Sequence, residues 1–266
     1  MATTAISPAM NVIRPNLFSI YFKETKYELL KCLRLPMYSV STVAFPIMFY
    51  VLFGLIMGRQ NIGNVSTTTY LIAAYGTFGV MGASLFGTAA TLASERGFGW
   101  LEMKKASPMP PFAYFFAKVV MSMIFSATDV VLLLILGTAF GGVHLPAIVT
   151  AKLFLTLVAG SLPFCAMGLA IGYFAGPTSA PAFINVFYLP MSFCSGLWIP
   201  FIFLPKFVQK IAILLPPFHL SQLALGLVGA GNGRVMRSHW EALIGFAMIC
   251  LGIAWAGHQR DQKANG

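Results

Sequence analysis

Long apolar runs without charged residues alternate with short polar segments along the chain. A helix needs about 20 apolar residues to cross the hydrocarbon core of a bilayer. Each of the runs can hold at least one such helix, and Gly/Pro-rich residues 176–181 supply a turn within the longest run. The pattern therefore predicts an all-α, polytopic membrane protein with six transmembrane helices. These predicted spans are residues 35–58, 68–93, 113–139, two within 153–205, and 240–257.

Residues 204–233 form a further apolar segment, which we do not interpret as a regular span. It contains the pair Pro216 and Pro217 and several glycines up to Gly233. Irregular backbone at membrane depth must be covered by protein, because lipid offers it no hydrogen bonds. We expect a re-entrant element of two half-helices on the outer side, before the last span.

The composition supports a membrane protein. Hydrophobic residues make up 58% of the 266 residues and charged residues only 9%, against about 25% charged residues in soluble domains. Disorder is excluded by the same values. The net charge of +10 comes from basic residues that flank the apolar runs, which indicates contact with anionic headgroups rather than nucleic acid.

The lysines and arginines also predict the orientation. With the N-terminus inside, ten of them lie in inner segments and six in outer segments. We therefore expect a multi-pass protein of the inner (plasma) membrane with both termini cytoplasmic. The N-terminal residues lack the pattern of a cleaved signal peptide. Residues 1–15 are expected to be a flexible tail, residues 35–257 the transmembrane domain and residues 258–266 a second tail.

Residues 16–34 predict an amphipathic helix that lies in the membrane interface. Its apolar residues gather on one side of the helix, and Pro36 ends it. The cations expected to face headgroups are Lys23, Lys26, Lys31 and Arg34. This elbow helix is either a plain membrane anchor or an element that also touches a cytoplasmic partner.

Residues 94–111 are the most charged short stretch, between the second and third spans. The residues from Trp100 to Lys105 predict a short helix bounded by Gly97 and Gly99 before it and by Pro108 after it. Such a helix is suited to docking into a groove on another protein. The alternative is an ordinary cytoplasmic loop with an interfacial tryptophan.

Several motifs occur together in one order. They are Glu95-Arg96-Gly97 with Leu101, Ser107-Pro108 and Pro110, then Ser195-Gly196-Leu197-Trp198-Ile199-Pro200, Leu204-Pro205, and the stretch from Leu214 to Leu220. In this order, with the elbow helix and six spans, the chain from about residue 16 onward resembles the permeases of ABC-2 type transporters. One departure is Asp129 in the third span, which has no place in that pattern.

The resemblance implies an exporter subunit without enzymatic activity of its own. Two permease chains, expected to be a homodimer, would work with two nucleotide-binding subunits that hold ATP and Mg. The chain contains no Gly-Lys dipeptide and thus no loop of the Walker-A type. The residues expected to couple to the ATPase are Glu95, Arg96, Gly97, Trp100, Leu101 and Glu102.

Polar residues within spans are costly and often functional. Asp129 either binds a proton or cation or forms a hydrogen bond to a neighbouring helix. The set Phe183, Asn185, Phe187 and Tyr188 on the fifth span either lines a substrate path or belongs to a core aromatic cluster.

The histidines are scattered along the chain and no metal-binding or catalytic motif is present. Two alternative functions remain. One is a stand-alone secondary transporter or channel that uses Asp129. The other is a membrane enzyme acting on lipids, which lacks a supporting cluster of Asp, Glu or His at the membrane face. Rows of small residues at every fourth position, such as Gly168, Gly172 and Gly176, pack helices closely within one chain or between two.

Overall fold

A computed structural model describes residues 16–56, 61–62, 65–107, 109–231, 233 and 235–265. The predicted flexible tail 1–15 lies outside the described residues, as do Arg59, Pro108 and Gly266, the last residue of the predicted C-terminal tail.

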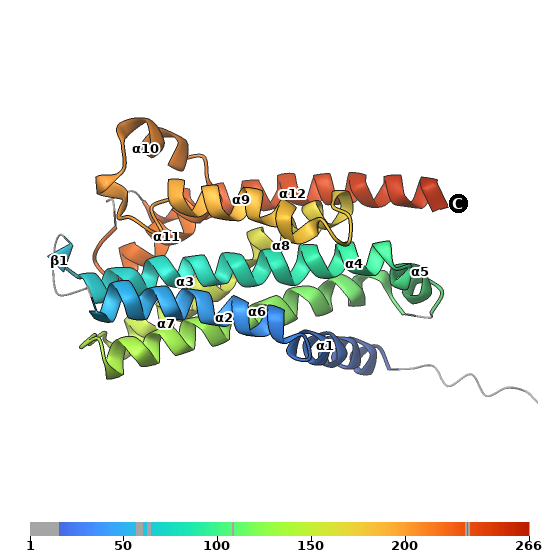
Figure 1. The fold of residues 1–266 in the computed structure, drawn as a ribbon, viewed down its shortest axis with the longest axis horizontal. Coiled ribbons are helices and arrows are strands. Elements are labelled where there is room, and N and C mark those ends of the chain that lie inside the picture. The colour runs from blue at the N-terminus through green and yellow to red at the C-terminus, as the bar shows by residue number, and fades with distance from the viewer. Residues whose placement is uncertain are drawn as a thin grey trace, which may run out of the picture.

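Long helices run side by side along the longest axis of the molecule (Figure 1). The helical elements are α1 (Leu17–Leu33), α2 (Pro36–Phe49), the π-helix η1 (Tyr50–Ile56), α3 (Thr67–Leu85), the π-helix η2 (Phe86–Ala90), α4 (Thr91–Gly97), α5 (Trp100–Lys105), α6 (Pro111–Ala139), α7 (Ala147–Ala159), α8 (Ser161–Phe174), α9 (Ala180–Cys194), the 3-10 helix η3 (Phe201–Phe203), α10 (Lys206–Ala212), α11 (Pro216–Leu227) and α12 (Met236–Asn265). The strands β1 (Asn61–Ile62) and β2 (Val65–Ser66) form a small antiparallel pair.

The predicted all-α membrane architecture is confirmed. Within the described residues, five helices are long and apolar enough to cross a membrane: Tyr38–Ile56, Thr67–Gly97, Phe112–Ala139, Ala147–Phe174 and Met236–Lys263. These five correspond to five of the six predicted spans. The two short strands pair with each other between the first two of these helices.

The remaining predicted span is shorter than expected. It corresponds to α9, whose 15 residues extend about 22 Å at 1.5 Å per residue, less than the roughly 30 Å of a hydrocarbon core. The helix ends because Gly196 adopts a left-handed conformation (φ 79°) and Pro200 follows shortly after it. The pair α10 and α11 is bent by 92° at its break and is either a broken span or a re-entrant loop, in the segment for which half-helices are expected.

The continuous helix of α3, η2 and α4 lies at the centre of the bundle, and nearly all of its most apolar stretch is buried. Small residues on α8 allow this close packing. A Cβ added at Gly168 would lie 1.8 Å from the Thr88 hydroxyl, and one at Gly172 would lie 2.9 Å from the Leu92 side chain. This small-residue row therefore packs helices of one chain against each other.

The two ends of the bundle differ. One end carries α1, α5 and the C-terminal end of α12, and the opposite end carries β1, α10 and α11 (Figure 1). The elbow helix α1 packs against α6 and turns into α2 at its end. The end that carries α1 and α5 contains the charged residues of the elbow helix and of the loop 94–111, and we call it the charged end.

Candidate functional site

The helix predicted from Trp100 to Lys105 is present as α5. It begins directly after Gly99, which has a left-handed backbone (φ 74°) that glycine adopts without strain. Three apolar side chains around it are exposed: Phe98 at 63%, Trp100 at 54% and Met103 at 73%. We call these three the α5 ridge. A ridge of large exposed apolar side chains is typical of a protein-interaction surface.

The α5 helix is fastened to the bundle on its other side. Leu101 is buried in an apolar cluster with Leu92, Tyr114 and Tyr173. Lys104 of α5 forms an ion pair with Glu24 of α1, with 2.6 Å between Nζ and Oε1. The α5 helix is therefore tied to the elbow helix, to the central helix and to α6, so a force on the α5 ridge reaches all three.

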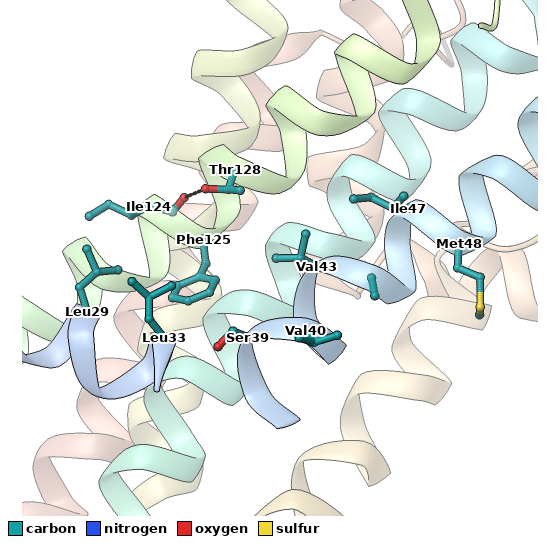
Figure 2. A pocket seen from close by; sticks show the side chains of 11 residues that line it. Leu29, Leu33, Ser39, Val40, Val43, Ile47, Met48, Ile124, Phe125 and Thr128 are labelled. Atoms are coloured by element: carbon teal, nitrogen blue, oxygen red, sulfur yellow. Dashed lines mark hydrogen bonds between the residues drawn. The ribbon is translucent and has the colours of Figure 1, made fainter. Parts of the chain in front are cut away.

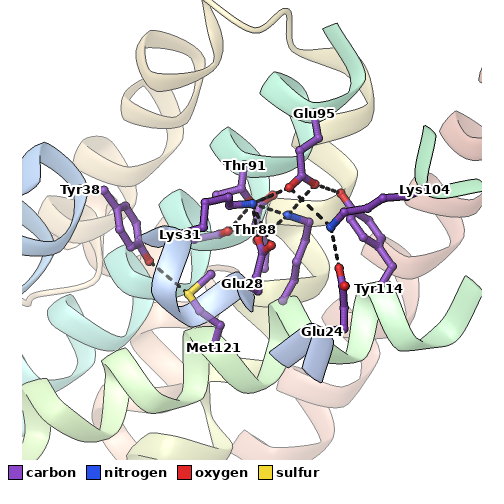
Figure 3. Close-up of polar contacts among 12 residues, drawn as sticks. Glu24, Glu28, Lys31, Tyr38, Thr88, Thr91, Glu95, Lys104, Tyr114 and Met121 are labelled. Atoms are coloured by element: carbon purple, nitrogen blue, oxygen red, sulfur yellow. Dashed lines mark hydrogen bonds and ion pairs between the residues drawn. The ribbon is translucent and has the colours of Figure 1, made fainter. Parts of the chain in front are cut away.

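A buried ionic cluster of Glu28, Lys31, Glu95 and Lys118 joins α1, α4 and α6. Figure 3 labels three of its members, Glu28, Lys31 and Glu95. The Lys118 ammonium is fully buried and lies 2.8 Å from Glu28 Oε1 and 3.0 Å from Glu95 Oε2. Lys31 lies 2.7 Å from Glu28 Oε1 and also pairs with Glu95. Two carboxylates and two ammonium groups balance in charge, which a site with little access to water requires.

Neutral groups complete the cluster. The Tyr114 hydroxyl donates a hydrogen bond to Glu95, and Lys118 donates one of 2.8 Å to the Thr91 hydroxyl. Burial alone would raise the pKa of Glu28, but the Lys118 and Lys31 ammonium groups outweigh it and hold that pKa below its ordinary value. Glu28 is thus a carboxylate that supports the contact between α1, α4 and α6.

A second ionic contact joins the end of α4 to α8 and α12. The Arg96 guanidinium lies 2.6 Å from Asp261 Oδ2 and donates a hydrogen bond of 2.7 Å to the Gly172 carbonyl oxygen. Gly97, the next residue, approaches the turn at 176–181 so closely that an added Cβ would lie 2.4 Å from Pro177 Cγ. The close approach of α4 to this turn depends on the missing side chain at residue 97.

The structure separates the residues predicted to contact the ATPase. Trp100 and Glu102 lie at the surface, whereas Glu95 is 3% and Leu101 6% exposed. The predicted direct contact with a partner does not fit Glu95 or Leu101, because both side chains are enclosed by this chain. Arg96 is likewise bound to groups of its own chain, through Asp261 and the Gly172 carbonyl.

The elbow helix departs from its prediction at one cation. Lys23, Lys26 and Arg34 are exposed, as expected for residues that face headgroups. Lys31 instead turns into the ionic cluster, because Glu28 and Glu95 lie within reach on the side of α1 that packs on the bundle.

Sequence reasoning missed several functional candidates. Phe98 and Met103 of the α5 ridge flank the predicted contact residues. They could have been found in the sequence as large apolar residues within a charged loop. Glu28 and Lys118 were not assigned a role. The signal for this pair is an acidic residue, Glu28, within an apolar-faced helix and a lysine within a predicted span whose other charged residue is Asp129.

The predicted path residues of α9 do not share one environment. Phe183, Asn185 and Phe187 are exposed on the outer side of α9, and the two phenylalanine rings contact edge to face at 5.5 Å. Tyr188 is buried, stacks on Phe78 and donates a hydrogen bond of 3.2 Å to the Phe78 carbonyl oxygen. Tyr188 therefore belongs to the core aromatic cluster.

Asp129 is fully buried in the middle of α6, and neither carboxylate oxygen has a hydrogen-bond partner among the described residues. It packs against the bare backbone of α3, where a Cβ added at Gly79 would lie 2.9 Å from Asp129 Oδ2. Among the described residues, the hydrogen bond to a neighbouring helix, one of the two alternatives for Asp129, is thus not formed.

The histidines are less scattered than the sequence indicates. His219 of α11 and His239 of α12 lie 2.8 Å apart between their Nδ1 atoms. In the described part of the chain, no group of three or more His, Cys, Asp or Glu side chains is placed to hold a metal ion.

The apolar helices, the buried ionic cluster at one end and the exposed ridge beside it define a multi-pass membrane protein with a surface suited to a partner. The chain belongs to the ABC-2 type transporter family, whose model matches residues 22–227. It is 24% identical over 210 residues to YvfS of Bacillus subtilis (strain 168), which is named as a transport permease. That match covers 79% of this chain and 86% of the relative. The chain is therefore a transport permease, and not an enzyme.

Proposed function

We propose that this permease is the membrane-spanning subunit of an ATP-driven exporter. A separate nucleotide-binding subunit binds ATP and Mg, and two copies of the permease form the transmembrane part. The charged end faces the cytoplasm, as the excess of lysine and arginine in the inner segments favours, and the protein lies in the plasma membrane.

The α5 ridge carries the proposal. Phe98, Trp100 and Met103 are exposed on a helix that is held in place by Leu101 and by the Lys104–Glu24 ion pair. Exposed aromatic and methionine side chains on a rigid support are typical anchors of an interface. When the ATPase subunits move, the ridge transmits that movement to α1, α4 and α6 through the buried ionic cluster.

The ridge can be tested by purifying the permease together with the cognate ATPase. Trp100→Ala combined with Met103→Ala removes two anchors and leaves Leu101 and the ionic cluster intact. Removing central anchors costs about 2 kcal/mol or more each, so we expect the ATPase to be lost from the purified complex while the permease keeps its abundance.

The matched control is Phe140→Ala, which removes an equally exposed aromatic side chain (74%) at the other end of α6. It should retain the ATPase in full. Retention of the ATPase by the Trp100/Met103 double variant would contradict a docking role for the ridge.

A second candidate function is a stand-alone secondary transporter or channel that uses Asp129. Its support is the buried carboxyl group without a hydrogen-bond partner, since ionisable groups within spans often mark ion pathways. Transport by the purified permease in vesicles without any ATPase, lost in Asp129→Asn, would favour this candidate over the exporter.

A further inference from the structure

A groove of about 670 Å³ opens on the outer surface of the bundle between α1, α2 and α6 (Figure 2). Val43 and Ile47 of α2 and Phe125 of α6 line it, and Leu29 and Leu33 of α1 lie at one end. Residues at its rim are exposed, with Val40 at 62% and Met48 at 51%. The groove therefore faces the surroundings of the bundle, which are lipid in a membrane.

The two hydroxyl groups of the groove have no free donor for a polar ligand. The Ser39 hydroxyl donates to the Cys32 carbonyl oxygen at 2.7 Å, and the Thr128 hydroxyl donates to the Ile124 carbonyl oxygen at 2.9 Å. Water would need about twenty molecules of about 30 Å³ each to fill the volume, and apolar walls cannot hydrogen-bond to them. The lining instead suits a hydrocarbon chain.

The length of the groove suits one leaflet. Its α2 wall runs from Val40 to Met48, and the eight steps between these residues extend about 12 Å at 1.5 Å per residue. One leaflet is about 15 Å thick, half of the hydrocarbon core. An acyl chain that enters from the headgroup region beside α1 therefore fits along most of its length.

Positive charge lies at the α1 end of the groove. Lys26 precedes the groove residue Leu29 by one helical turn, and Arg34 directly follows Leu33 at the end of α1. Both cations are exposed. The two carboxylates of α1 are already paired, Glu24 with Lys104 and Glu28 with Lys118. The mouth of the groove thus presents cations whose charge α1 itself does not neutralise.

We propose that this groove binds one acyl chain of an anionic phospholipid, whose phosphate contacts Lys26 and Arg34. The bound chain fills the gap between α2 and α6 and links both helices to the elbow helix. The site goes beyond the proposed function, because it requires only that the chain lies in a membrane.

The test uses the full chain in vesicles of phosphatidylethanolamine and phosphatidylglycerol, with a trace of phosphatidylglycerol that carries a photoreactive acyl chain. Mass spectrometry of the cross-linked peptides should place adducts mainly in residues 40–48 and 124–128. Unlabelled phosphatidylglycerol should compete for these adducts and phosphatidylcholine should not. Adducts spread evenly over the exposed helices, without dependence on the headgroup, would overturn the proposal by showing only general lipid contact.

Two sets of variants test the parts of the site. Ala44→Trp fills the groove and should remove the groove adducts, whereas Val131→Trp, on the exposed side of α6 outside the groove, should leave them. Lys26→Gln with Arg34→Gln leaves the fold untouched and should weaken competition by phosphatidylglycerol roughly thirtyfold, five- to sixfold per cation. The control Lys152→Gln should have no effect.

A second copy of the chain is the other possible occupant. In that case Ala44→Cys would cross-link two chains in the vesicles and the groove segments would carry no lipid adducts. Such a cross-link would overturn the proposal. Unchanged competition by phosphatidylglycerol in the Lys26→Gln, Arg34→Gln variant would overturn it as well.

Discussion

Replacing Lys118 tests how strongly the buried ionic cluster holds the charged end together. Lys118 is fully buried and lies within 3.0 Å of two carboxylates that are each 3% exposed. Lys118→Met keeps most of the side-chain volume. It leaves Glu28 and Glu95 with two partly exposed cations, Lys31 at 28% and Lys104 at 30%, the latter 3.9 Å from Glu95 Oε1. Removing one partner from a buried pair costs about 3–5 kcal/mol, because a charge stays behind without compensation.

Thermal unfolding of the purified permease in detergent, followed by tryptophan fluorescence, measures this cost. At about 2–4 °C per kcal/mol for a chain of this size, the Tm should fall by roughly 6–20 °C. Lys152→Met, which removes an exposed lysine of α7, should leave the Tm unchanged. Adding Glu28→Gln to Lys118→Met removes one of the stranded charges and should recover part of the loss. An unchanged Tm in Lys118→Met would refute the reasoning.

Two further predictions concern pH and packing. The pKa of Glu28 is lowered in the folded protein, so the Glu28 carboxylate stabilises the fold fully above the ordinary pKa of 4.5, and this stabilisation is lost as the pH falls through the lowered pKa. From pH 7 to below 4.5, the Tm should therefore decrease more steeply in the native protein than in Glu28→Gln. Parallel curves would contradict this. Gly168→Val places a Cβ 1.8 Å from a threonine hydroxyl and should cost about 1–3 kcal/mol, whereas Gly245→Val, with open space around it, should not; equal Tm values for the two variants would contradict the close contact.

The membrane architecture could be predicted because it depends on local properties of the sequence. Uncharged runs of spanning length marked the long helices, since a charge in lipid is costly wherever it lies. Breaker residues also act locally: Gly99 starts α5 in a left-handed conformation, and the predicted bounds of this helix match the structure. The length of α9 was overestimated, because the absence of charge in residues 153–205 does not show where the helix ends. In the structure it ends before Gly196 and Pro200.

The environment of the charged residues could not be predicted in the same way. Glu28, Glu95 and Lys118 come from three different helices, and Glu28 and Lys118 are 90 positions apart. Their pairing therefore arises only when α1, α4 and α6 pack. Periodicity placed Lys31 on the polar side of α1, but it gave no information about a carboxylate on another helix. Leu101 was identified as part of the loop, yet its burial depends on a pocket between α4, α6 and α8.

The contact between the α5 ridge and an ATPase is the central claim, and a site-specific cross-link measures it most directly. A photoreactive amino acid is placed at Met103, the most exposed side chain of the ridge, and, as a control, at Phe140. After irradiation of membranes that contain both subunits, the account predicts an adduct with the ATPase from position 103 and none from position 140. A complex that co-purifies intact but yields no adduct from position 103 would contradict it.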